Sequence, residues 1–232
     1  MHDTIVIFSH WFGVRKHSGW LFTDIADALQ ILSIESVLFN YNEYNEETRE
    51  LFALPFSAQA KILQEIINTT VREHPDKRII IIWHSQGCII PCLCDLSSVH
   101  ALVMLSPFFH TEIKSVIERY TKDPANTFSL TNQSTRKRSD GSTTIIPPEY
   151  WRERFDTDIT KLYNETATKK NMYIISPLQD EIMDFNEYKK LKNLFILNLD
   201  GDHNFSQQRR QPVIGRIKYI IQSVWFLSYR RK

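Results

Sequence analysis

Glycine, strong net charge, long apolar runs and paired cysteines are all scarce in this sequence. It has 6 glycines among 232 residues, whereas globular proteins contain about 7 % glycine. Its 28 Lys and Arg residues against 27 Asp and Glu residues leave a formal net charge of +1. This balance provides no long-range attraction to nucleic acids or anionic membranes, so we expect neither as a partner. The basic runs at 136–138 and 230–232 are interpreted as solvated loop and tail charges.

The hydrophobic segments are too short for a membrane span. No run approaches the ~18 apolar residues that a spanning helix needs, and the first residues lack the pattern of a secretory signal. The three cysteines, Cys88, Cys92 and Cys94, are odd in number and closely spaced. They favour reduced thiols in the cytoplasm over a disulfide framework, and their spacing is not that of a zinc site. No other feature of the sequence implies a metal or an organic cofactor, so we expect neither.

Six short apolar runs, rich in β-branched residues and bounded by turn residues, predict strands. They cover residues 4–9, 36–41, 78–83, 101–106, 172–176 and 193–199. An unbroken run such as the isoleucines at 79–82 is typical of a strand covered on both faces. Amphipathic helices are predicted at 20–32, 55–72 and 212–227. Strands alternating with helices predict an α/β fold with an open, mainly parallel six-stranded sheet and helices on both faces.

The alternation is interrupted between the fourth and fifth predicted strands. This segment carries helix-like pieces at 111–120 and 148–163, separated by a polar stretch at 127–144. A long connection of this kind inside a compact domain is usually functional or disordered. We interpret 108–171 as an inserted lid over the carboxyl edge of the sheet, with 1–107 and 172–232 forming the core.

A candidate nucleophile directly follows the third predicted strand. The segment reads Trp83-His84-Ser85-Gln86-Gly87. A serine at a sharp turn from strand to helix exposes its hydroxyl at the end of the sheet, and the following helix points its N-terminus at the reacting centre. The alternative is that Ser85 only caps a helix, as serines often do.

Two further candidates follow the fifth and sixth predicted strands. Asp180 and His203 lie on loops at the same edge of the sheet as Ser85, and Ser, Asp, His is the chain order of α/β hydrolases. His203 is predicted to take the proton of Ser85, and Asp180 to fix the tautomer of His203. Glu181 and Asp184 are the alternative acids.

Acyl-transfer chemistry also needs two backbone N–H donors for the oxyanion. One is predicted at Gln86, directly after the nucleophile. The other is predicted at Phe12, in the loop after the first strand, with His10 supporting that loop.

The segments at 10–13, 83–87, 180–183 and 200–205 together resemble the α/β-hydrolase superfamily, within it the cinnamoyl/feruloyl-esterase-like and serine-aminopeptidase-like branch. The corresponding motifs of that branch read H-G-F-G, G-H-S-Q-G, D-E-I-V and G-A-D-H-N-F. The resemblance implies a serine hydrolase that cleaves small or medium carboxylic esters through an acyl-enzyme intermediate. A peptidase or amidase of the same superfamily is the nearest alternative.

Trp11 and Trp83 stand where that branch has glycine. Both lie in crowded turns where glycine permits close backbone approach. Trp83 is therefore expected to push the turn that carries Ser85, the nucleophile elbow, off its strand. Taken literally, the two residues favour a catalytically impaired, hydrolase-like binding protein. We hypothesise instead that the source gene reads UGA as glycine and that the codon was translated as tryptophan, which also accounts for the few glycines.

Overall fold

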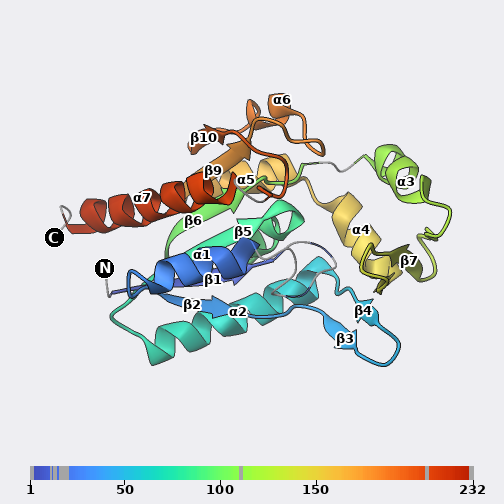
Figure 1. Ribbon diagram of the computed structural model, residues 1–232, viewed down its shortest axis with the longest axis horizontal. Coiled ribbons are helices and arrows are strands. Elements are labelled where there is room, and N and C mark those ends of the chain that lie inside the picture. The colour runs from blue at the N-terminus through green and yellow to red at the C-terminus, as the bar shows by residue number, and fades with distance from the viewer. Residues whose placement is uncertain are drawn as a thin grey trace.

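The computed structural model describes residues 3–10, 12, 15, 21–109, 112–206 and 209–229. Its main sheet has six parallel strands in the order β10-β9-β6-β5-β1-β2 (Figure 1). The strands are β1 (Thr4–Ser9), β2 (Glu35–Leu38), β5 (Arg78–His84), β6 (Val99–Leu105), β9 (Asn171–Pro177) and β10 (Phe195–Leu199). Each overlaps one of the six predicted runs, so the predicted parallel sheet is confirmed.

The isoleucine run at the centre of β5 explains why helices cover both faces of this sheet. Ile79 and Ile81 belong to one buried cluster, while Ile80 and Ile82 belong to another. Successive side chains of a strand point to opposite faces, so all four are buried only if both faces are covered. Residues of α1 (Leu21–Gln30) and α7 (Arg210–Tyr229) cover one face, and those of α2 (Phe56–Glu73) cover the other (Figure 1).

The chain after β5 differs from the helix that we expected there. It forms two short 3-10 helices, η1 (Ser85–Cys88) and η2 (Ile90–Leu93), in place of one α-helix. Pro91 gives the physical reason, because it has no backbone N–H and its ring clashes with the preceding turn of an α-helix. The chain leaves the turn at Cys94, whose N–H donates to the Pro91 carbonyl at 3.1 Å.

A second, four-stranded sheet was not predicted. Its order is β3-β4-β8-β7, from β3 (Glu43–Asn45), β4 (Glu50–Phe52), β8 (Thr143–Ile146) and β7 (Ser134–Lys137). The polar stretch at 127–144, read as a loop, thus contains β7 and the first part of β8. β4 lies in the part that we predicted as core, and β8 lies in the 108–171 segment. Their parallel pairing therefore joins the two parts by backbone hydrogen bonds.

The predicted helices of the 108–171 segment are present with altered bounds. They are α3 (Ile113–Thr121), α4 (Pro148–Asp156) and α5 (Ile159–Ala167). The expected helix at 148–163 is divided because Asp158 caps α5, accepting from the Lys161 N–H at 3.0 Å. A short helix not expected from the sequence, α6 (Phe185–Tyr188), follows β9.

Trp151 of α4 organises an aromatic core within the 108–171 segment. Its ring centroid lies 5.0 Å from that of Phe128, 5.3 Å from Tyr120 and 6.0 Å from Phe155. The indole N–H donates to Ser134 Oγ at 2.9 Å. These aromatic side chains pack on one another and belong to the same buried cluster as the α2 face of the main sheet.

Within the part of the chain that the structure describes, no helix is both long and apolar enough to cross a membrane. The described residues also contain no group of three or more His, Cys, Asp or Glu side chains placed to hold a metal ion.

Candidate active site

Ser85 occupies a strained turn at the carboxyl end of β5. Its φ of 53° lies in the left-handed region, which costs a residue with a side chain free energy and marks functional turns. Gly87 allows this turn to pack against the end of β1. A Cβ at Gly87 would lie 2.4 Å from the carbonyl oxygen of His10 and 2.9 Å from that of Ser9. Only glycine fits there, because both obstacles are backbone atoms.

The structure brings Ser85, His203 and Asp180 together from three separate strand ends. His203 Nε2 lies 2.8 Å from Ser85 Oγ, and His203 Nδ1 lies 2.9 Å and 3.0 Å from the two Asp180 carboxylate oxygens. The side chains of His203 and Asp180 are each 3 % exposed. A hydroxyl, an imidazole and a carboxylate in this order can move a proton from the serine to the histidine.

The surroundings of Asp180 keep its carboxylate ionised. One of its oxygens accepts from the backbone N–H groups of Ile182 and Met183, each at 2.9 Å. Burial raises the pKa of Asp180. The hydrogen bond and charge interaction with His203 and the two backbone donors lower the pKa, and together they outweigh the effect of burial. The pKa of Asp180 therefore lies below its ordinary value.

The two alternative acids have other roles. Glu181 accepts a hydrogen bond from the backbone N–H of His203 at 3.0 Å, so it holds the loop and not the imidazole. Asp184 caps α6 by accepting from the Asn186 N–H at 2.8 Å. Of the three acids that the sequence left open, only Asp180 is bonded to the ring of His203.

His84 and Ser106 support His203 and were not singled out from the sequence. The carbonyl oxygen of His203 accepts from His84 Nε2 and from Ser106 Oγ, each at 2.8 Å. Burial lowers the pKa of His84 to about 3, so its imidazole is neutral with the proton on Nε2. The signal available in the sequence was their position, because His84 is the last residue of β5 and Ser106 directly follows β6.

The loop after β1 is held by contacts to the chain following β2. The Tyr41 N–H donates to His10 Nε2 at 3.1 Å, and the two rings pack edge to face at 5.0 Å. The Tyr41 hydroxyl lies 2.6 Å from Ser9 Oγ, which also donates to the Gly87 carbonyl at 3.3 Å. His10 thus supports the loop, as expected from its position.

Tyr150 of α4 contacts both residues that we predicted as oxyanion donors. Its ring lies 4.9 Å from that of Phe12, and its hydroxyl accepts a hydrogen bond from Gln86 Nε2. Two arginines reach the same pair: Arg138 Nη2 lies 3.3 Å from the Phe12 carbonyl, and Arg154 Nη1 lies 3.4 Å from Gln86 Oε1. The 108–171 segment therefore contacts both of the predicted oxyanion donors.

Trp83 lies in the core without displacing the elbow. Its side chain is 0 % exposed and belongs to the buried cluster on the α2 face. Its indole N–H has no hydrogen-bond partner among the described residues. The close approach of Gly87 to His10 shows that the turn still packs on β1, contrary to the expected displacement. Trp11 lies outside the described residues.

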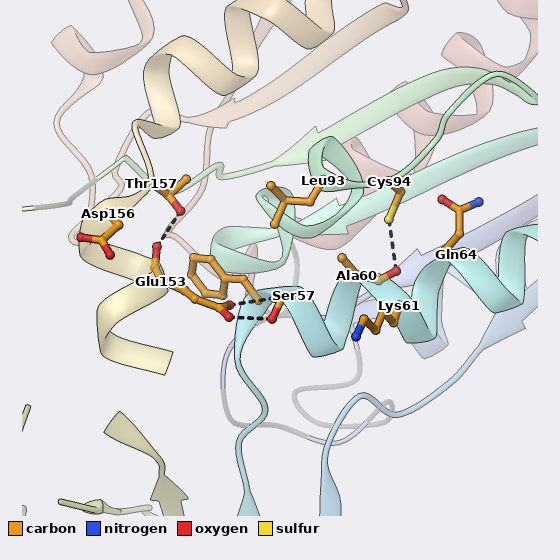
Figure 2. A pocket seen from close by; sticks show the side chains of 10 residues that line it. Ser57, Ala60, Lys61, Gln64, Leu93, Cys94, Glu153, Asp156 and Thr157 are labelled. Atoms are coloured by element: carbon orange, nitrogen blue, oxygen red, sulfur yellow. Dashed lines mark hydrogen bonds between the residues drawn. The ribbon is translucent and has the colours of Figure 1, made fainter. Parts of the chain in front are cut away.

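A cavity of about 610 Å³ lies between α2 and α4, and its lining does not include Ser85, Asp180 or His203. Figure 2 shows Glu153 of α4 pointing toward Ser57 in the first turn of α2. The Glu153 carboxylate accepts from the Ser57 N–H at 2.8 Å and from its hydroxyl at 2.6 Å. This contact ties the 108–171 segment to α2.

The sequence matches no family profile and no curated protein. Solved structures do resemble the chain. Est1E of Butyrivibrio proteoclasticus with bound ferulic acid aligns with 95 % of this chain and 88 % of its own, at 14 % identity and a TM-score of 0.69. An esterase of Pyrococcus furiosus aligns over 95 % and 82 %, at 14 % identity and a TM-score of 0.67. A monoacylglycerol lipase of Paleococcus ferrophilus aligns over 91 % and 92 %, at 12 % identity and a TM-score of 0.59.

At such low identities this likeness establishes the fold. The chain has the α/β-hydrolase fold, in agreement with the resemblance seen in its motifs.

Proposed function

We propose that this protein is a serine hydrolase that cleaves small or medium carboxylic esters. The observation that carries the proposal is the continuous series of contacts from Ser85 Oγ through His203 to the Asp180 carboxylate. The strained backbone of Ser85 at the end of β5 supports a nucleophile over a simple helix cap. The esterase and lipase among the similar structures support an ester as the substrate.

In this mechanism Ser85 Oγ attacks the ester carbonyl carbon while His203 Nε2 takes the hydroxyl proton. Asp180 holds the imidazole in the required tautomer and stabilises the imidazolium. The backbone N–H groups of Phe12 and Gln86 donate to the tetrahedral oxyanion. When the intermediate collapses, the C–O bond to the alcohol breaks and His203 returns the proton to the leaving oxygen. A water molecule, activated by His203, then hydrolyses the acyl-enzyme.

We assign 108–171 the role of a lid. Tyr150 and Arg138 contact Phe12 in the loop after β1, and Arg154 contacts Gln86 at the elbow. A segment that touches both of these loops is positioned to shape an acyl pocket and limit access of water.

A reducing, cytoplasmic location is part of the proposal. Cys88, Cys92 and Cys94 are free thiols, and burial raises the pKa of Cys92 and of Cys94 to about 12. Thiols in this state are unreactive core residues.

Covalent labelling tests the nucleophile. A fluorophosphonate should label the wild-type protein at Ser85, and Ser85→Ala should abolish both labelling and turnover of p-nitrophenyl esters. Ser115→Ala, which changes an exposed serine of α3, is the matched control and should leave both unchanged. Undiminished ester turnover by Ser85→Ala would contradict the proposal.

The same preparation separates ester from amide hydrolysis. A series of p-nitrophenyl acyl esters releases p-nitrophenol, and a series of aminoacyl p-nitroanilides releases p-nitroaniline. Turnover of both is followed by the absorbance of the leaving group. Faster turnover of the anilides would assign the peptidase or amidase alternative, while labelling of Ser85 without turnover of either series would favour an impaired binding protein.

A further inference from the structure

Two arginines of the 108–171 segment approach the residues predicted to bind the oxyanion. Arg154 of α4 is only 7 % exposed, and its Nη1 lies 3.4 Å from Gln86 Oε1. Arg138, directly after β7, places Nη2 at 3.3 Å from the Phe12 carbonyl and donates from Nε to Thr144 Oγ1 at 2.9 Å. Each guanidinium group therefore contacts one of the two residues predicted as oxyanion donors.

Arg154 has neutral hydrogen-bonding partners in Gln86 and Tyr150, but no anionic partner among the described residues. Its guanidinium carbon lies 4.7 Å from the ring centroid of Phe108 and 5.6 Å from that of Trp151, so aromatic faces cover it. Within the described part of the chain it forms no ion pair, and its buried Nε has no hydrogen-bond partner. Buried charges are normally paired, so this arrangement lacks an anion.

Arg138 is also poorly neutralised. Among the described residues no carboxylate lies within ion-pair distance of it. Asp140 is the nearby acid, but its carboxylate accepts from the N–H and the hydroxyl of Ser142 at 2.9 Å and 2.6 Å. Burial and, after it, the charge of the neighbouring Arg136 lower the pKa of Arg138 to about 10. The guanidinium nevertheless stays charged at neutral pH.

The two cations share Tyr150. Its phenol interacts with Arg154 and with Arg138, and its ring packs on Phe12. Burial lowers the pKa of Arg154, and the positive charges of Arg119 and Arg136 lower it further. The surroundings of Arg154 are thus electropositive. They adjoin the side chain of Gln86, the residue that follows Ser85.

We infer that Arg154 and Arg138 bind a carboxylate carried by the substrate, so that the preferred esters are monoesters of dicarboxylic acids. A guanidinium offers several N–H donors in a planar arrangement that matches a carboxylate. An acyl chain ending in a carboxylate would supply the missing anion while its ester carbonyl lies at Ser85. This inference rests on the proposed ester hydrolase activity and specifies its substrate class.

The experiment compares pairs of p-nitrophenyl esters that differ only at the far end of the acyl chain. Hemisuccinate is matched with butyrate, hemiglutarate with valerate, and hemiadipate with hexanoate. For the wild type, kcat/KM for at least one carboxylate ester should exceed that of its neutral partner by about tenfold or more, since a site built for a polar group discriminates against analogues that lack it.

Arg154→Gln and Arg138→Gln should each lower the ratio of carboxylate to neutral ester turnover, and Arg154→Lys should retain more of it than Arg154→Gln. The ratio is taken within one preparation, so a variant that folds less completely still reports selectivity. Arg152→Gln is the matched control, because Arg152 is an exposed arginine of the same helix and pairs with Glu149 at the surface. Its ratio should equal that of the wild type.

Two results would overturn the inference. One is a wild-type ratio near unity for all three chain lengths. The other is a high ratio that survives both glutamine variants, which would mean that the arginines only fasten the segment to Phe12 and Gln86. Loss of Ser85 labelling and of turnover for every ester is a different result: it contradicts the proposed function itself and the inference with it.

Discussion

His84 donates from Nε2 to the backbone carbonyl of His203 at 2.8 Å, so the residue before the nucleophile holds the loop that carries the base. The elbow and the loop that carries His203 are far apart in sequence. This bond joins them in addition to the contact between Ser85 and the imidazole. The position of His203 therefore depends on a second, neutral histidine. Ser106 donates to the same oxygen from the end of β6.

This bond predicts a specific loss of stability in acid. Folding lowers the pKa of His84 from its usual 6.5 to about 3, because burial disfavours the cation. Between these two values the unfolded chain binds a proton that the folded protein does not, so stability falls as pH falls through that window. His84→Gln keeps an N–H donor but does not titrate, and it should lose less stability than the wild type over this window.

Denaturant unfolding at a series of pH values from about 7 to about 4 measures this difference. Ser106→Ala serves as the control, because it removes the other donor to His203 without removing a titrating group. It should lower stability by about 1 kcal/mol at every pH and leave the pH dependence unchanged. Equal pH dependence in wild type and His84→Gln would show that His84 does not carry the effect.

Asp180→Asn should reduce kcat by about 10⁴-fold, because an amide neither stabilises the imidazolium nor keeps the histidine in the required tautomer. Glu181→Gln is the comparison. Its side chain retains an oxygen that can accept from the His203 N–H, so we expect less than about a tenfold loss. Steady-state turnover of one p-nitrophenyl ester measures both, and a larger loss in Glu181→Gln would assign the acid to Glu181.

Gly87→Ala should destabilise the fold and lower activity together. The added methyl carbon would meet backbone atoms of His10 and Ser9, which cannot rotate away, so the elbow or the loop after β1 must shift. Overpacking of this kind costs about 1–3 kcal/mol. Gly215→Ala is the control, since nothing lies within 4 Å of a Cβ at that position of α7.

Removing a glycine from a helix interior stabilises by about 0.5–1 kcal/mol, so the two alanine variants should shift the unfolding midpoint in opposite directions. Thermal unfolding together with ester turnover provides the test. Wild-type activity in Gly87→Ala would mean that the elbow does not need its close contact with His10.

The main sheet and the three candidate catalytic residues were predictable from the sequence for a physical reason. Parallel strands buried on both faces have continuous apolar runs, as at 79–82, and such runs are easy to recognise. Residues that follow these strands share one edge of the sheet. Ser85, Asp180 and His203 could therefore be grouped before any distance between them was known.

The second sheet could not be predicted in this way. β3 (Glu43–Asn45) and β7 (Ser134–Lys137) are short and polar, with no apolar alternation. Their pairing depends on β4 meeting β8, which lies far along the chain. The role of Arg154 was hidden for a similar reason. α4 reads as a charged helix, and only its packing against Phe108 and Gln86 distinguishes this arginine from the exposed Arg152 beside it.

Trp83 provides the last prediction, together with Trp11. If the source gene reads UGA as glycine, both codons are UGA, and UGG at either position would reject the hypothesis there. The structure adds a physical argument at position 83, because the buried indole N–H of Trp83 has no partner among the described residues. Trp83 lies in β5, two residues before Ser85. Burying an unpaired polar group is unfavourable, and a side chain that the core did not evolve to hold overpacks it by about 1–3 kcal/mol.

The Trp11→Gly, Trp83→Gly protein should therefore unfold at a higher denaturant concentration than the sequence as given and turn over esters faster. The opposing effect is the cavity that a removed indole leaves, which costs about 3–5 kcal/mol when the surrounding core was built around tryptophan. Relief of overpacking raises the free energy of unfolding, whereas a new cavity lowers it. The single variant Trp83→Gly therefore distinguishes a native glycine from a native tryptophan. A gain in stability identifies glycine as the residue for which this core is shaped, because no cavity-forming substitution stabilises a core that evolved around the larger side chain. A loss of several kcal/mol identifies tryptophan as the native residue.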